Sequence, residues 1–75
     1  MEKIVISIMS DILDIPADLL NIESTIENTE KWDSLNQLTI ILALEEHYKI
    51  TFPDEVLPTL NSIKGILKYL EQIHA

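Results

Sequence analysis

Apolar residues recur at helical spacing near both ends of the chain. Near the N-terminus they predict an amphipathic helix over residues 2–14, which ends before Pro16 because the residue preceding a proline is biased out of the helical region. Its apolar face consists of Ile4, Val5, Ile8, Met9, Ile12 and Leu13. Near the C-terminus a second amphipathic helix is predicted over residues 62–73, with Asn61 or Ser62 as its cap and an inner face of Ile63, Ile66, Leu67 and Leu70. Gly65 lowers the helix propensity of that segment and suggests a close helix contact.

The segments between these helices carry weaker helical signals and no strand pattern. Residues 15–33 form a long connection with one turn predicted at PADLLN, and four apolar residues are expected to hold it against the core: Leu19, Leu20, Ile22 and Ile26. Pro53 and Pro58 bracket a short helical turn. The fold is therefore predicted to be all-α, a small four-helix bundle with three main helices, one short helix and a long loop after the first helix. The length and the lack of repeats predict a single domain, residues 1–75.

Residues 34–48 predict a helix that is apolar on two sides. One side carries Ile40, Ile41, Ala43, Leu44 and Tyr48, and the opposite side carries Leu35, Leu38 and Leu42. Such a helix is either surrounded by the other helices or binds a partner. Thr39, Glu45 and Glu46 flank the three leucines, and because acids are rarely buried unpaired, they favour an exposed, partner-binding surface.

The composition limits the classes of partner. Thirteen acidic against five basic residues give a formal net charge of −8, which argues against nucleic-acid binding and favours protein partners with basic patches. No segment approaches the roughly 20 apolar residues of a membrane span, and the N-terminus lacks the features of a signal peptide. With no Cys, 13 Ile and 11 Leu, the chain is expected to be a cytoplasmic monomer that dense aliphatic packing stabilises without disulfides or metal.

Ser34 is the residue at which the sequence pattern indicates a candidate site of chemical modification. It directly follows Asp33, a good N-cap residue, so the plain interpretation is ordinary capping at the start of a helix. The alternative is a phosphate ester on the hydroxyl, because the free N–H groups and the macrodipole of a helix N-terminus favour an anion. A catalytic serine is not indicated, because there is no G-x-S-x-G motif and His47 and His74 are expected to be surface residues. The protein is not predicted to be an enzyme.

The segment WDSLNQLTIILALEEHYKITFPDE, residues 32–55, closely resembles the acyl carrier proteins and the related peptidyl carrier domains. The shared pattern begins with Asp33-Ser34-Leu35 at the start of the second helix. An aliphatic run follows, and then come Ala43-Leu44-Glu45-Glu46, Tyr48 and Phe52-Pro53-Asp54-Glu55. The other helices match in length and order, so the resemblance covers essentially the whole chain.

The resemblance implies a covalent cofactor and a recognition surface. The cofactor is 4'-phosphopantetheine, joined to Ser34 by a phosphodiester beside Asp33 and Leu35 and holding acyl groups as thioesters. The implied partners are a phosphopantetheinyl transferase and acyl-loading, acyl-transfer or condensing enzymes. They would contact a face made of Leu35, Leu38, Thr39, Leu42, Glu45 and Glu46.

Two departures from fatty-acid carriers bear on the pathway. Asn36, Gln37 and Thr39 are neutral where those carriers usually have acids, and Lys31 and Trp32 replace smaller residues. Trp32 either changes the surface that a partner meets or anchors the loop on the core. The departures favour a carrier for polyketide, nonribosomal peptide or polysaccharide assembly, with fatty-acid synthesis also open. The alternatives are an aminoacyl or peptidyl carrier and an unmodified helical interaction module.

Overall fold

The computed structural model describes residues 1–74, without the side chain of His74. Three α-helices and two short 3₁₀ helices follow one another as α1 (Glu2–Leu13), η1 (Ala17–Leu19), α2 (Ser34–Tyr48), η2 (Asp54–Thr59) and α3 (Ile63–His74). Among these residues the extended pairing is limited to one isolated antiparallel bridge between Thr25 and Ser62. The prediction of a small all-α bundle with a long loop after the first helix is confirmed.

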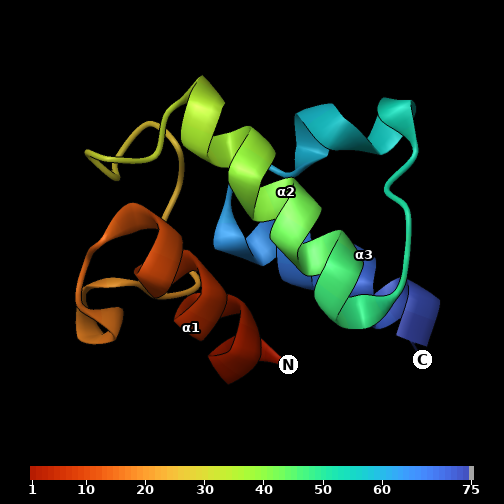
Figure 1. Cartoon of the computed structure of the whole chain (residues 1–75), viewed down its shortest axis with the longest axis horizontal. Helices are drawn as coiled ribbons and strands as arrows, with labels where there is room; N and C mark the ends of the chain where they lie inside the picture. The colour runs from red at the N-terminus through yellow and green to blue at the C-terminus, as the bar shows by residue number, and fades with distance from the viewer. Residues whose placement is uncertain (75) are drawn as a thin grey trace.

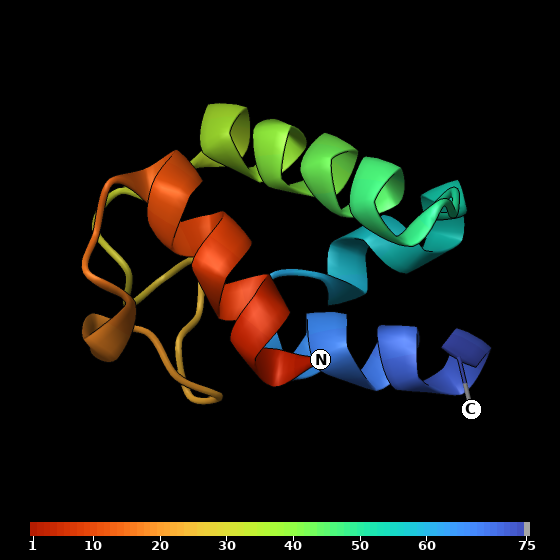
Figure 2. The same ribbon diagram turned by 60° about the horizontal axis from the view of Figure 1, so that its bottom comes forward.

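The three main helices are arranged around one apolar core. In Figure 1, α2 runs diagonally across the front of the molecule, with α3 behind it and α1 beside it. After a rotation, Figure 2 shows α2 and α3 on opposite sides of the molecule, with α1 crossing from one toward the other. Helix η2 lies on the connection that leads from the end of α2 back to the start of α3. The core consists of Val5, Met9, Leu13, Leu20, Trp32, Ile40, Ile41, Leu44, Phe52, Leu60, Ile63, Ile66, Leu67 and Leu70.

Helix α1 ends one residue earlier than predicted. Asp14 adopts a left-handed conformation (φ 56°, ψ 47°), and its N–H donates to the carbonyl oxygen of Ser10. Asp is one of the few residues that visit this region readily, so it can end the helix before the restriction imposed by Pro16 applies. The buried stripe is also narrower than expected, because Val5, Met9 and Leu13 are buried at i, i+4 spacing whereas Ile4 is 40% exposed.

The long loop is held mainly by its backbone. The N–H of Ile26 donates to Asn61 O at 2.9 Å, and the N–H of Ile63 donates to Ser24 O at 3.0 Å, so the loop pairs with the start of α3. Of the four predicted anchors, Leu20 is buried and Ile26 packs against the core. The prediction is wrong for Leu19 and Ile22, which are 66% and 41% exposed. Leu19 ends η1 and Leu20 follows in extended conformation, so the two adjacent side chains diverge.

Gly65 makes the close contact that its position suggested. A Cβ atom there would collide with the carbonyl oxygen of Thr59, the last residue of η2. Ser62 is the cap of α3, because its Oγ accepts the N–H of Gly65 at 2.9 Å. The contact partner is thus the short 3₁₀ helix, which lies directly against the first turn of α3.

Candidate functional site: the start of helix α2

Asp33 is the N-cap of α2, as predicted. Its backbone is extended (φ −119°, ψ −175°), and its Oδ1 accepts the N–H of Asn36 at 2.9 Å. Its carbonyl oxygen accepts the N–H of Gln37 at 2.8 Å. The two amides before these, those of Ser34 and Leu35, have no partner within the helix. Exposed Ser34 therefore lies where free N–H groups and the positive end of the helix dipole favour an anion.

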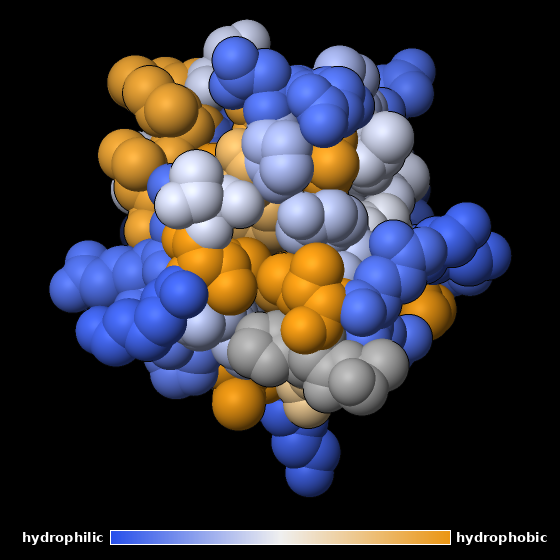
Figure 3. All heavy atoms as spheres, turned by 90° about the vertical axis from the view of Figure 1, so that its right-hand side faces the viewer, coloured by the Kyte–Doolittle hydropathy of each residue, from blue (hydrophilic) through white to orange (hydrophobic). Residues whose placement is uncertain are grey.

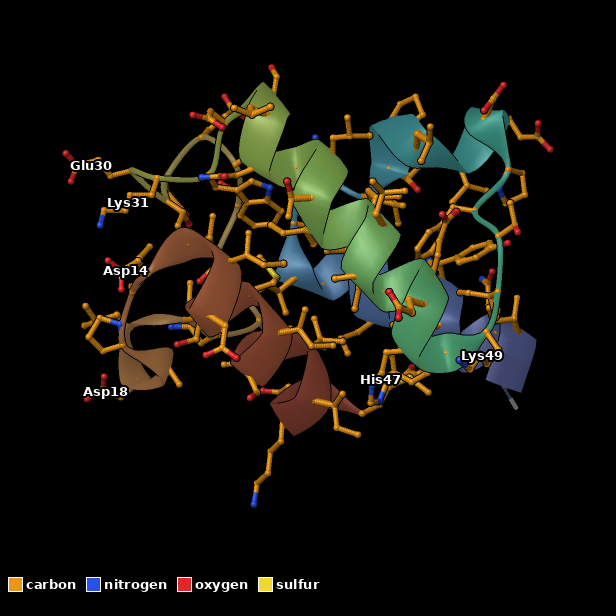
Figure 4. All side chains as sticks on the ribbon, in the orientation of Figure 1. Asp14, Asp18, Glu30, Lys31, His47 and Lys49 are labelled. Carbon is orange, nitrogen blue, oxygen red and sulfur yellow. The ribbon has the colours of Figure 1, made fainter. Side chains whose placement is uncertain are left out.

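The histidine on α2 lies too far away to act as a base for Ser34. His47 is 13 residues later, which corresponds to roughly 20 Å along the axis at 1.5 Å per residue. Figure 4 shows His47 near the opposite end of α2, and its ring centroid lies 4.8 Å from that of Tyr48. At that end, burial raises the pKa of the Tyr48 phenol above its ordinary value of 10.0, so Tyr48 stays neutral. The side chain of His74 lies outside the described residues.

Helix α2 has one buried and one exposed apolar side. Ile40, Ile41 and Leu44 are buried in the core. The leucine face, which we define as Leu35, Leu38 and Leu42, is 74%, 58% and 57% exposed. The prediction that this stripe reaches solvent is confirmed. Apolar groups of this kind recur elsewhere on the surface: Figure 3 shows hydrophobic side chains between strongly hydrophilic ones on the side that includes the C-terminus.

The two acids beside the leucine face have different environments. Glu46 is exposed, whereas Glu45 is half-buried and its Oε2 accepts the N–H of Phe52 at 2.8 Å. Glu45 thus fixes the segment that leads from α2 into η2. The sequence reasoning missed this contact, because only the return of the chain toward α2 brings the amide of Phe52 to the carboxylate.

The residues before Ser34 point away from it. Trp32 is only 2% exposed, so of the two interpretations of this residue, the loop anchor is correct. The Nζ of Lys31 lies 3.4 Å from Asp14 O and 4.0 Å from the Asp14 carboxylate. Figure 4 shows Lys31 beside Asp14, on the side of the molecule formed by the loop and the end of α1. The surface around Ser34 is therefore less altered by these two residues than the sequence suggested.

Two amides after Ser34 are engaged inside the chain. The Nδ2 of Asn36 donates to Lys31 O at 2.8 Å. Gln37 accepts the indole N–H of Trp32 on its Oε1 at 2.5 Å and donates from its Nε2 to Leu60 O at 2.8 Å. The sequence identified both residues only as missing acids. Their neutral amides are used to join the start of α2 to the loop and to the segment before α3.

Comparison with known proteins identifies the family to which this arrangement belongs. Residues 3–70 match the family model described as "Phosphopantetheine attachment site". The chain belongs to the phosphopantetheine-binding carrier proteins. An acyl carrier protein of Campylobacter jejuni subsp. doylei is 30% identical over 67 residues, which cover 89% of this carrier and 87% of that protein. An acyl carrier protein of Campylobacter hominis is 34% identical over 62 residues, covering 83% and 78% of the two chains.

The cofactor of this carrier is covalently bound 4'-phosphopantetheine. The start of α2 fits such a group, because it offers an exposed hydroxyl on Ser34 and two backbone N–H groups for a negatively charged phosphodiester. Among the residues whose side chains the structure describes, no cluster of three or more His, Cys, Asp or Glu could hold a metal ion. None of the helices described for this carrier has the length and apolar character needed to cross a membrane.

Proposed function

We propose that this protein is a non-catalytic acyl carrier and that Ser34 carries its 4'-phosphopantetheine. The observation that supports this most directly is the exposed serine at the capped N-terminus of α2, within the matched family region. The names of the Campylobacter relatives support an acyl cargo over an aminoacyl or peptidyl one. The family match disfavours the alternative of an unmodified interaction module.

The carrier and the phosphopantetheinyl transferase contribute different groups to the attachment reaction. The Ser34 Oγ forms a bond to the phosphorus that bears pantetheine in coenzyme A, the pyrophosphate P–O bond breaks, and adenosine 3',5'-bisphosphate leaves. The hydroxyl proton passes to a base of the phosphopantetheinyl transferase, since His47 lies near the far end of α2. The N–H groups of Ser34 and Leu35 and the dipole of α2 favour the phosphodiester that results. When bound, the cofactor supplies the thiol that holds acyl groups as thioesters, because the chain itself has no Cys.

The transferase and the acyl-handling enzymes bind the leucine face with Thr39, Glu45 and Glu46. Exposure of all three leucines supports this assignment, since a contiguous apolar surface on a small monomer commonly marks an interaction site. Glu46 is exposed, so its carboxylate can contact a basic group of a partner. Glu45 also serves the fold through its bond to Phe52.

The pathway we favour is a specialised one, such as polyketide, nonribosomal peptide or polysaccharide assembly, rather than general fatty-acid synthesis. Its support is the lack of charge on the first turns of α2. Leu35, Leu38 and Thr39 are exposed and neutral, and the amides of Asn36 and Gln37 bond within the chain. Partners of this carrier therefore meet an apolar rather than an acidic surface on the first turns that follow Ser34, beside the single acid Asp33. We place it in the cytoplasm as a monomer.

The decisive test is modification of the purified protein by a broad-specificity phosphopantetheinyl transferase with coenzyme A. Intact-mass spectrometry should show the gain of one phosphopantetheinyl group on the wild type and none on Ser34→Ala. Circular dichroism of Ser34→Ala checks that the variant is folded. A wild-type protein that stays unmodified with several transferases contradicts the carrier function, and a modified Ser34→Ala contradicts the assignment of the residue.

A further inference from the structure

Three segments of the chain meet through one side chain just after Ser34. Gln37 uses its carbonyl oxygen to accept the indole N–H of Trp32 at 2.5 Å and its NH₂ group to donate to Leu60 O at 2.8 Å. A neutral amide can accept and donate at once, which an ionised carboxylate cannot do. We call this arrangement the Gln37 clasp, consisting of Trp32, Gln37 and Leu60.

In the sequence, Ser34 lies between Trp32 and Gln37, two members of the Gln37 clasp. In space, the clasp joins this stretch of chain to buried residues. Trp32 lies two residues before Ser34 and Gln37 three residues after it, so the serine lies on the short stretch between the two bonded side chains. Trp32 and Leu60 are 2% and 0% exposed. Leu60 also lies in a well-connected segment, because its own N–H bonds to Leu57 O and the next carbonyl, that of Asn61, accepts the N–H of Ile26.

The N-cap alone does not fix where Ser34 points. Asp33 satisfies the amides of Asn36 and Gln37, but these bonds lie within the first turn and would move with it. Helix ends fray, and an exposed first turn can rotate or open while its cap stays formed. Gln37 is the residue that ties this turn both to the preceding loop and to the segment before α3.

We infer that Gln37 is a positioning residue for the modification of Ser34. This inference rests on the proposed attachment at Ser34. By holding the first turn of α2 at a set orientation, the Gln37 clasp presents the Ser34 hydroxyl in one geometry to the transferase. Both polar ends of Gln37 are used inside the chain, so it acts through the position of Ser34 and not through contact with the partner.

Variants at the clasp separate positioning from folding. Gln37→Met keeps an unbranched side chain of similar length but loses both hydrogen bonds, and Trp32→Phe keeps an aromatic ring but loses the indole donor. Gln72→Met, on exposed helix α3 surface, is the matched control for the chemistry of the substitution. The single-turnover rate of modification is measured at increasing transferase concentration by intact mass. All variants are compared at a temperature where circular dichroism shows them folded.

The limiting rate for Gln37→Met is expected to fall roughly tenfold, because a reacting group displaced by about 1 Å can lose up to 10²-fold in rate. The half-saturating transferase concentration should change by less than about twofold, since the leucine face is untouched. The limiting rate for Trp32→Phe should also fall. The double variant should be no slower than Gln37→Met, because both substitutions remove the same hydrogen bond between Trp32 and Gln37. Hydrogen exchange of the amides of residues 36 and 37, which both bond to Asp33, should be faster in both single variants.

Each other outcome has a defined meaning. A folded Gln37→Met that is modified at the wild-type rate overturns the positioning role and leaves the proposed carrier function intact. A loss confined to the half-saturating concentration also overturns it, because Gln37 would then contact the transferase. If Gln37→Met does not fold, Trp32→Phe carries the same test with the same expected loss. Failure of the wild type to be modified counts against the carrier function itself.

Discussion

At the residue scale, Asp33 decides where the helix that bears Ser34 begins. Its carboxylate accepts the amide of Asn36 at 2.9 Å, which satisfies one of the N–H groups that a helix start leaves without an intrahelical partner. Asn at this position provides an equivalent acceptor, whereas Ala provides none. The contribution of the capping hydrogen bond to stability can therefore be separated from the contribution of the negative charge of Asp33.

Replacing Asp33 by Ala should lower the free energy of unfolding by about 1 kcal/mol, the usual cost of losing an N-cap side chain. Asp33→Asn is the control and should change it by only a few tenths of a kcal/mol. Urea denaturation followed by circular dichroism measures both. Equal losses for the two variants would mean that the charge of Asp33, and not its capping bond, stabilises α2.

Gly65 is the second position at which one residue type is required. Ala is the better helix former by about 1 kcal/mol, so propensity alone predicts that Gly65→Ala stabilises α3. The added Cβ would collide with Thr59 O, a backbone atom that cannot rotate away as a side chain could. Overpacking of this kind typically costs about 1–3 kcal/mol. We expect a net loss of roughly 1 kcal/mol in urea denaturation.

Gln72→Ala provides the control for Gly65→Ala. Gln72 lies on the same helix with an exposed side chain, so its replacement should change the free energy of unfolding by no more than about 0.5 kcal/mol. A Gly65→Ala protein that is more stable than the wild type would show that η2 can move away from α3 at little cost.

At the element scale, α2 combines a surface buried in the core with the exposed leucine face, which we propose as the recognition surface. Leu44 is 0% exposed and packs in the core, while Leu42, two residues earlier, is 57% exposed on the leucine face. Two residues correspond to about 200° around a helix with 3.6 residues per turn, so the two leucines point in nearly opposite directions. Replacement by Ala therefore tests core packing at Leu44 and partner binding at Leu42.

Leu44→Ala should destabilise the protein by about 2–5 kcal/mol, as expected for a buried leucine that leaves a cavity. Leu42→Ala should change stability by less than about 1 kcal/mol but weaken binding to the transferase several-fold. Thermal unfolding and a titration of the transferase measure the two effects. A large drop in melting temperature for Leu42→Ala would refute the assignment of this residue to the partner face.

At the scale of the whole molecule, the negative charge is spread over several elements. Asp14, Asp18 and Glu30 lie around the loop side of the molecule in Figure 4. Glu46 is exposed on α2. With a net charge of −8, the molecule as a whole is expected to attract a basic partner, whereas the proposed contact surface, the leucine face, is mainly apolar.

The rate of association with the transferase should consequently fall as salt rises, because long-range attraction is screened over about 8 Å at physiological ionic strength. The dissociation rate, which depends on apolar contacts with the leucine face, should change less. Stopped-flow binding between low and high NaCl concentrations measures both rates. Association that is insensitive to salt would mean that the acidic residues act only in solubility and that the transferase needs no basic patch.

The sequence by itself determined the features that depend on neighbouring residues. The 3.6-residue period located the three main helices and the two apolar sides of α2, and the preference of Asp for the N-cap placed Ser34 at the first helical position. The exposure of the leucine face also followed from the local pattern, because acids flank the three leucines on one helix and acids are rarely buried unpaired. These features arise within a turn or two of chain, where sequence distance and spatial distance agree.

Only the tertiary structure decided the orientation and partners of the remaining residues. Adjacent Leu19 and Leu20 are equally apolar, and the docking of the loop against the start of α3 leaves only Leu20 inside. Gln37 and Glu45 find their partners 23 and 7 residues away, at Leu60 and Phe52. A polar side chain can bond to water or to any donor or acceptor that packing brings near it. Its partner is therefore fixed by how the elements pack together, which the local sequence does not encode.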